Sequence, residues 1–323
     1  MKLDQVVRYL ASKPWAMEPL ALAALVDVVA HRSVGDATPM PEGVEPAIGG
    51  TAWYLDIGAA GIPHQSAGAV ARRAGRVGVL PIRGTILNRL SGMQAMSGGT
   101  SIETLTKSFV GMRNASDVKA IVLDIDSPGG SVDGLPEMAT LIHESRGSKP
   151  IVAQVNVCAA SSAYWLAAQA DEIAVTPSGD VGSIGVVTVH QDMSAALEKM
   201  GIKHTVIAST PFKAEGNPFG PLEEEALASI QADVATFDTM FHDAVAQGRG
   251  VKASAVRAEY GQGRMVLADA AVKRGMADRV ATMEQTLNRF GVSMLGGSRA
   301  AQAPPSTRMA ARSFLRRVRL NAQ

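Results

Sequence analysis

The sequence contains one cysteine and no long hydrophobic run, and its charges of opposite sign almost balance. Because Cys158 has no second cysteine to pair with, an intramolecular disulfide framework is excluded and a reducing compartment fits. No stretch approaches the roughly 20 apolar residues that a membrane-spanning helix requires. The nearest, residues 16–30, carries Glu18 and Asp27 and is typical of an amphipathic helix. A net charge of +1 argues against a chain built as a whole to attract polyanions.

Several functional signatures are missing as well. The N-terminus has no basic segment followed by an apolar core and a small-residue cleavage site, so we expect a cytoplasmic protein with no membrane association. No P-loop, HExxH motif or metal-ligand spacing of cysteines and histidines occurs, so we expect no metal and no cofactor. The 323 residues are 46% hydrophobic and 19% charged, which is typical of a soluble globular protein with a sizeable core.

The pattern of apolar segments divides the chain into three parts. We expect N-terminal helices and a Gly/Pro-rich arm over residues 1–75, a main domain over 76–290, and a basic, flexible tail over 291–323. In the main domain strands alternate with helices, which favours an α/β fold of parallel βαβ units. The predicted strands are residues 76–82, 118–125, 151–155, 172–175, 184–189 and 203–207, and the predicted helices begin near Ser101 and cover 131–145, 160–170, 194–200, 221–247 and parts of 253–280.

The most informative segment is 157–165, where Ser161 and Ser162 follow two alanines at a predicted helix start. A hydroxyl ringed by small residues can be approached closely by a carbonyl carbon. Earlier in the chain, Gly129 and Gly130 follow a predicted strand, and adjacent glycines can turn backbone N–H groups toward the oxygen of that carbonyl. A nucleophile and an oxyanion hole are the parts that acyl transfer needs most. Cys158, which has no cationic neighbour, is expected to pack in the core as an inert thiol.

A serine nucleophile also needs a base to take its proton. Of the six histidines, only His190, at the end of a predicted strand, is a candidate. The alternative is Lys213, which lies in a Gly/Pro-rich segment after a predicted strand. Burial disfavours a charged ammonium, so a desolvated lysine can act as an uncharged base. The residue pattern alone leaves both possibilities open.

Residues 76–280 resemble the S49 serine peptidases, the signal peptide peptidase A family. The resemblance is carried by four segments in the same order as in the family, namely 121–130, 159–164, 182–186 and the segment around Lys213. It implies the ClpP/crotonase-like fold, which is built of repeated ββα and βαβ units, and identifies residues 76–290 as an S49 peptidase domain.

The resemblance also implies a Ser–Lys catalytic dyad. Ser161 matches the nucleophile of the family, Lys213 the general base, and Ser183 the serine that orients the lysine amine. No metal or nucleotide takes part in such a mechanism.

The oxyanion hole is then expected to use backbone N–H groups of Gly129 or Gly130 and of Ser162. The chain departs from many relatives at Ser162, which places a second hydroxyl beside Ser161. This leaves open whether Ser162 can react in its place.

Segments 14–17, 124–132 and 216–219 are similar to the phage and prophage branch of the family, the head-assembly (prohead) peptidases of the minor capsid protein C type. The similarity implies a serine endopeptidase of the host cytoplasm or procapsid. We expect its polypeptide substrates to be scaffold, capsid or its own ends. We also expect a homo-oligomer and an association with portal or capsid. Because only residues 281–323 follow Val280, we expect the C-terminal scaffolding segment of some relatives to be absent or separately encoded.

Two other functions compete with this one. A crotonase-type acyl-CoA enzyme shares the fold and the glycine oxyanion hole but uses carboxylates as acid and base, for which Glu137 and Glu172 are the nearest candidates. A catalytically inactive capsid-assembly factor would keep a vestigial dyad and use its basic tail to bind scaffold or DNA. Apart from that tail, we expect no nucleic-acid binding.

Overall fold

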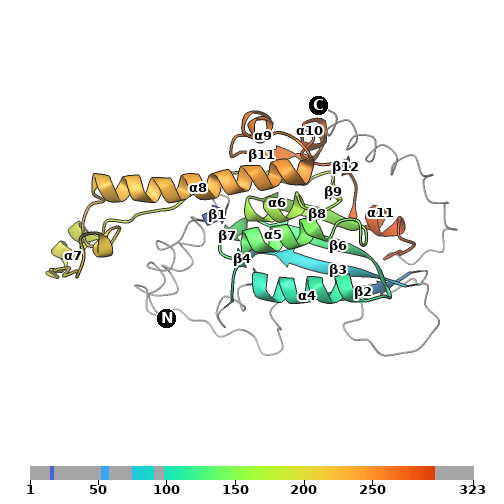
Figure 1. Ribbon diagram of the computed structural model, residues 1–323, viewed down its shortest axis with the longest axis horizontal. Coiled ribbons are helices and arrows are strands. Elements are labelled where there is room, and N and C mark those ends of the chain that lie inside the picture. The colour runs from blue at the N-terminus through green and yellow to red at the C-terminus, as the bar shows by residue number, and fades with distance from the viewer. Residues whose placement is uncertain (1–14, 18–51, 58–74, 91–97, 295–323) are drawn as a thin grey trace.

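The computed structural model describes residues 15–17, 52–57, 75–90 and 98–294 (Figure 1). These residues form a mixed α/β fold with two sheets. Within these ranges, no helix combines the length and hydropathy that crossing a bilayer takes. Residues 295–323 of the predicted basic tail and most of residues 1–75 lie outside the described residues, whereas Val292 is buried in a core cluster.

The larger sheet has a parallel core, as the alternation of strands and helices predicts. β3, β6, β8, β9 and β10 run parallel, and β2 and β11 pair antiparallel at the ends of the order β11-β10-β8-β6-β3-β2. β9 pairs with the first half of β8, and β10 with its last residues. The strands are β2 (Trp53–Asp56), β3 (Arg76–Arg83), β6 (Val118–Ser127), β8 (Ile151–Ala160), β9 (Glu172–Val175), β10 (Asp180–Gly182), β11 (Met265–Leu267) and β12 (Arg279–Val280).

Both faces of this sheet are covered. Val77 and Val79 of β3 belong to a cluster on one face that includes Leu287 of α11 (Met283–Asn288). Leu80 and Ile82, which alternate with them along the strand, belong to the main core on the other face. Side chains of a strand point alternately to its two faces, so a strand buried on both faces has an almost continuous apolar sequence.

Helices α4, α5 and α6 pack on the face of the main core (Figure 1). Ser101 caps α4 by accepting a hydrogen bond from the Thr104 N–H at 3.3 Å, so the helix start predicted near Ser101 is confirmed. The long helix α8 crosses above them, and α9 and α10 follow it. The helix bounds are α4 (Ile102–Asn114), α5 (Leu135–Glu144), α6 (Ser162–Ala167), α8 (Glu224–Arg249), α9 (Ala253–Glu259) and α10 (Ala268–Lys273).

Two strands of the smaller sheet continue strands of the larger sheet. β4 (Thr85–Leu87) follows β3 after Gly84, and β7 (Gly129–Ser131) follows β6 after Pro128. The strand order is β1-β7-β4-β5, with β5 at Gly99–Ser101 and β1 at Trp15–Met17. The Ser127 hydroxyl donates to the Gly84 carbonyl at 2.6 Å and ties the two crossing points together.

Residues 187–223, which we call the arm, project from the sheets beside the first half of α8 (Figure 1). The arm contains α7 (Ser194–Lys199) and the short 3-10 helix η1 (Pro211–Ala214). The predictions of strands over 184–189 and 203–207 are wrong, because no strand element covers either segment. Their apolar residues do not pair into either sheet, and Ile207 is 91% exposed.

Two further expectations need correction. Trp15–Met17 form a strand, not the start of a helix, because they pair with β7. The helix predicted over 131–145 begins only at Leu135, since Ser131 belongs to β7. Trp53–Asp56, within the expected Gly/Pro-rich N-terminal segment, add a strand to the larger sheet.

Candidate active site

Ser161 lies in a tight turn between β8 and α6. Its φ of 52° and ψ of −117° are unusual for a residue with a side chain, because positive φ brings Cβ close to the backbone. The turn is held on both sides: the Ser161 N–H donates to the Gly182 carbonyl at 2.7 Å, and the Trp165 N–H donates to the Ser161 carbonyl at 2.9 Å. A strained strand-to-helix turn of this kind can present a nucleophilic hydroxyl.

The Ser161 hydroxyl is fully buried and only loosely held. Its Oγ is 3.5 Å from the carbonyl oxygen of Gly185, which is a long distance for a hydrogen bond. A serine with no strong acceptor is free to turn its hydroxyl toward another base.

The glycine turn lies directly beside this serine. A Cβ added to Gly129, whose φ is +97°, would stand 3.0 Å from the carbonyl oxygen of Ala160, the residue before Ser161. The Gly129 N–H donates to the Ser127 hydroxyl at 3.1 Å, so this amide already has a partner. Gly130 sits between β1 and β4, opposite Ala16 and Ile86. The structure therefore brings Ser161 and the two glycines together.

Ser162 and Ser183 lie close to Ser161 along the backbone. Ser162 begins α6, and its buried Oγ has no hydrogen-bond partner within the described part of the chain. Ser183 follows β10, in which Gly182 is paired with Ala160, and it also has a positive φ, of 51°. The Ser183 N–H donates to the Arg264 carbonyl at 3.1 Å, which fixes the turn after β10.

Lys213 is not brought to Ser161 within one copy of the chain. It lies in η1 on the arm, its side chain is exposed, and its amine makes no hydrogen bond or ion pair with any described residue. Figure 1 shows the arm reaching away from α6, at whose start Ser161 lies.

His190 is also on the arm. Its Nε2 lies 3.1 Å from the carbonyl oxygen of Asn217, so its described partner belongs to the arm and not to the turn at Ser161. Cys158 is partly buried in β8. Burial, and then the neighbouring Asp180, raise the pKa of its thiol to about 12, which keeps it protonated and unreactive.

The two carboxylates of the crotonase alternative are not placed for such chemistry. Glu137 is exposed on α5. Glu172 accepts hydrogen bonds from Arg279 and, at 2.6 Å, from Arg289. Burial would raise the pKa of Glu172, but these two guanidinium groups outweigh it and leave that pKa lowered. A carboxylate paired in this way serves to hold α11 against the sheet.

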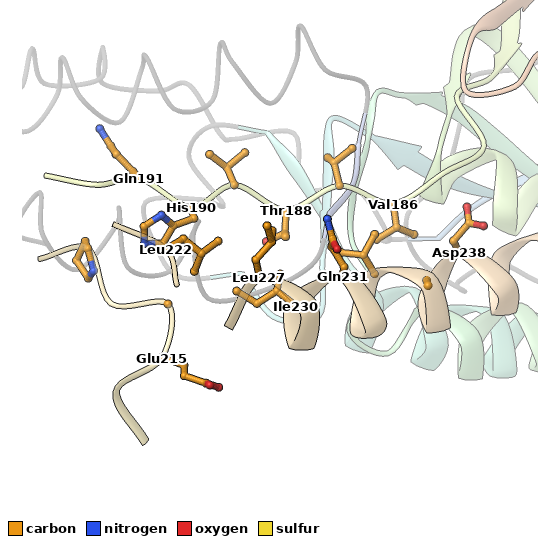
Figure 2. Close-up of a pocket in the computed structure, with 16 residues that line it drawn as sticks. Val186, Thr188, His190, Gln191, Glu215, Leu222, Leu227, Ile230, Gln231 and Asp238 are labelled. Carbon is orange, nitrogen blue, oxygen red and sulfur yellow. The ribbon is translucent and has the colours of Figure 1, made fainter. Parts of the chain in front are cut away.

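A groove of about 910 Å³ runs between segment 186–191 and the first half of α8. Figure 2 shows Val186 at the end nearest the sheets and His190 and Glu215 at the far end. Its lining includes Leu227 and Ile230 of α8. Because Val186 follows Gly185, whose carbonyl faces Ser161, the groove begins beside the serine.

Residues outside the predicted set also shape this region. The carbonyl groups of Gly182 and Gly185 hold or face Ser161, and their only sequence signal is the glycine spacing around Ser183. Nothing in the sequence signalled that Ala16 lies in a strand beside the site, because a strand of three residues has no recognisable period. The described residues hold no cluster of three or more His, Cys, Asp or Glu side chains able to bind a metal ion.

Comparison with known proteins adds the family context. The model of Peptidase family S49 matches residues 143–293. Head-tail preconnector protein GP5 of Enterobacteria phage P21 is 29% identical over 238 residues, which cover 74% of this chain and 47% of that protein. Capsid assembly protease C of Escherichia phage lambda is 30% identical over 241 residues, which cover 73% of this chain and 54% of that protein. The chain thus spans about half the length of these relatives.

Among solved structures, a variant of the 1510-N membrane-bound stomatin-specific protease aligns with 69% of this chain and 91% of its own, at 15% identity and a TM-score of 0.42.

Proposed function

We propose that the chain is a serine endopeptidase of phage head assembly, on the premise of the match between residues 143–293 and the model of peptidase family S49. The observation that carries the proposal is the placement of Ser161. This residue is held at positive φ beside two glycines, within the matched region. We infer a ClpP/crotonase-like architecture from the parallel sheet and from the strands β3 and β6 that continue into a second sheet.

In the proposed mechanism, the uncharged amine of Lys213 takes the proton from Ser161 as its oxygen attacks a peptide carbonyl. Backbone N–H groups of Gly130 and Ser162 hold the oxyanion, since the Gly129 N–H already donates to Ser127. The lysine then protonates the leaving amine, and water releases the acyl-enzyme by the same steps in reverse. Ser183 orients the lysine amine. These steps use only side chains and backbone groups of the chain.

The exposed position of Lys213 adds a condition to this mechanism. An ammonium in water stays charged, and burial is what disfavours its charged form. Lys213 has no described partner in its own copy, and the base must reach a serine that is buried. We therefore infer that the dyad forms between copies, with the arm of one placing its lysine at the serine of the next. A head-to-tail contact of this kind closes into a ring when its rotation permits.

The proposed substrates are extended segments of scaffold or capsid protein, or of the chain itself. The names of the two phage relatives support this choice, since one is a capsid assembly protease and the other a head-tail preconnector. The same context supports action in the host cytoplasm or the procapsid and an association with portal or capsid.

Mass spectrometry of the chain co-expressed with its neighbouring head proteins tests the proposal. We expect cleaved products with the wild type, none with Ser161→Ala or Lys213→Ala, and nearly unchanged products with Ser162→Ala. Cleavage that survives in Ser161→Ala but stops in Ser162→Ala would identify Ser162 as the nucleophile. Normal head assembly by Lys213→Ala without any cleavage would favour the inactive assembly factor instead.

A further inference from the structure

The strand β1 occupies the outer edge of the smaller sheet, next to the candidate nucleophile. It pairs antiparallel with β7, so that Trp15 is opposite Ser131, Ala16 opposite Gly130 and Met17 opposite Gly129. Each of the two glycines expected at the oxyanion hole therefore has a residue of β1 as its partner. In the order β1-β7-β4-β5, β7 has β4 on its other side.

The contact between β1 and the glycine turn is close. A Cβ added to Gly129 would stand 2.4 Å from the carbonyl oxygen of Ala16 and 3.0 Å from that of Ala160. The backbone of β1 is thus separated from the residue before Ser161 only by the width of Gly129. Ala16 is fully buried and Met17 is 3% exposed, so this short strand is a packed part of the site.

An extended polypeptide that approaches Ser161 needs hydrogen-bond partners for its backbone, and a free sheet edge supplies them. We propose that the edge of β7 is the docking edge for the polypeptide substrate, and that β1 occupies it as an internal competitor. The inference rests on the proposed function of Ser161. It follows that the wild-type chain with β1 in place is closed to substrate, and that β1 leaves before a substrate strand takes its position.

The side chain of Ala16 indicates what the docked strand presents. It packs with Val132 and Val186, and Val234 and Phe237 of α8 pack against this cluster. Val234 and Val186, the latter labelled in Figure 2, also line the groove along α8. A strand on β7 therefore directs its central side chain to the mouth of an apolar groove. We infer a preference for small or medium apolar residues at that position, because a buried charge there would lack a partner.

The first test weakens β1 and leaves the catalytic residues intact. In the full-length Ala16→Asp variant, the new carboxylate would be buried among valines, so β1 should leave β7. Substrate binds only to the fraction of molecules in which β1 has left β7, so displacing β1 raises the apparent affinity by the inverse of that fraction. We expect about a tenfold rise in kcat/KM on an unstructured polypeptide such as casein. The matched control is Ala258→Asp, at an exposed position of α9, which should leave the rate unchanged. Equal rates in both variants and the wild type would overturn the proposal.

A second variant strengthens β1 instead. Trp15 and Ser131 are opposite each other, and such antiparallel pairs have Cα atoms about 4.5–5.5 Å apart, within the range that a disulfide spans. The full-length Trp15→Cys/Ser131→Cys variant should lose at least about tenfold of its peptidase rate when oxidised and regain it with a reductant. Cys158, whose pKa is raised by burial, should not compete for the new thiols. An oxidised form as active as the reduced form contradicts the inference.

A binding measurement separates failure of this inference from failure of the proposed function. The probe is a synthetic peptide of residues 10–22, and the proteins are Ser161→Ala and Ser161→Ala/Ala16→Asp, neither of which needs to be active. We expect about tenfold tighter binding to the double variant. If the wild type proves to have no peptidase activity, this difference still decides whether β1 blocks a docking edge. If activity is present but the peptide binds both proteins equally, only the inference about β1 fails.

Discussion

The backbone at Ser161 combines a φ of 52° with a ψ of −117°, which glycine adopts at little cost and other residues adopt only under strain. The proposed role of Ser161 as nucleophile would account for a serine in this backbone conformation. Comparing Ser161→Gly with Ser161→Ala isolates the backbone cost, since both variants lack the hydroxyl. We expect Ser161→Gly to have the higher free energy of unfolding, by about 1–2 kcal/mol in urea titrations.

Ser148 provides the control, because its φ is not positive. There the alanine variant should be at least as stable as the glycine variant. A Ser161→Ala variant more stable than Ser161→Gly would mean that the turn carries no strain.

The Cys158 thiol gives a prediction for alkaline pH. Its pKa in the folded chain is raised from 9.0 to about 12, first by burial and then by Asp180. Between these values the folded state keeps a proton that the unfolded state releases, so stability present below pH 9 is lost as the pH rises toward 12. We expect the free energy of unfolding to fall less steeply above pH 9 in Cys158→Ala than in the wild type.

Tyr164 accounts for part of the remaining slope, because burial raises its pKa too. Parallel urea titrations of the two proteins at several alkaline pH values separate the two groups. Identical slopes would show that the Cys158 thiol is not buried as described.

At the scale of single elements, Arg146 ties the segment that follows α6 to the end of α8. The Arg146 guanidinium donates to the carbonyls of Gln169 at 2.7 Å and Ala170 at 2.6 Å, and also to that of Gly248 at 2.9 Å. We expect Arg146→Met to lower the free energy of unfolding by about 2–3 kcal/mol, because hydrogen bonds from a charged donor to half-buried carbonyls are lost.

Arg113→Met is the matched control for this change. Among the described residues, Arg113 on α4 reaches only Asn114 and Ser145, at 3.3 and 3.4 Å, so its loss should cost less than about 1 kcal/mol. If both variants lose the same free energy of unfolding in chemical denaturation, the hydrogen bonds of Arg146 contribute no more than those of Arg113.

The elements of the larger sheet could be predicted because their apolar runs are local and continuous. The sequence predicts the positions of β3, β6, β8 and β9, and it predicts the start of α4 near its N-cap residue Ser101. The segments 184–189 and 203–207 have the same apolar character but form no strand: Ile184 and Val186 are buried before the arm begins, and residues 187–189 and 203–207 lie on the arm. An apolar residue kept for the surface cannot be told from a core residue by pattern alone.

The candidate site was predictable only in its local parts. Ser161, Ser162, Gly129 and Gly130 follow strands that the sequence shows, so their meeting follows from adjacent parallel strands. The pairing of β1 with β7 could not be foreseen, since it joins three residues to a strand more than a hundred positions later. The separation of Lys213 from Ser161 was equally hidden, because it depends on how the arm projects.

At the scale of the whole molecule, the arm exposes apolar side chains to water, and burying them against a second surface would be energetically favourable. Ile207 is 91% exposed and Phe212, the residue before Lys213, is 59% exposed. If the arm docks on a second copy, Ile207→Asp should place a charge in that contact. We expect a smaller particle mass in light scattering and at least about a tenfold loss of peptidase rate at equal chain concentration.

Leu267 provides the comparison, since it is 68% exposed on β11, away from the arm. Leu267→Asp should change neither mass nor rate. A monomeric wild type with full activity would show that the arm does not serve assembly.

Mixing two inactive variants tests most directly whether Ser161 of one copy works with Lys213 of another. Ser161→Ala and Lys213→Ala, each without activity alone, are combined in equal amounts, dissociated together and reassembled. A site then needs an intact serine on one copy and an intact lysine on the next. In an equal random mixture each condition is met at about half of the sites, so we predict about a quarter of the wild-type peptidase rate. A mixture that stays as inactive as its components, although both variants are shown to co-assemble, would contradict a dyad shared between copies.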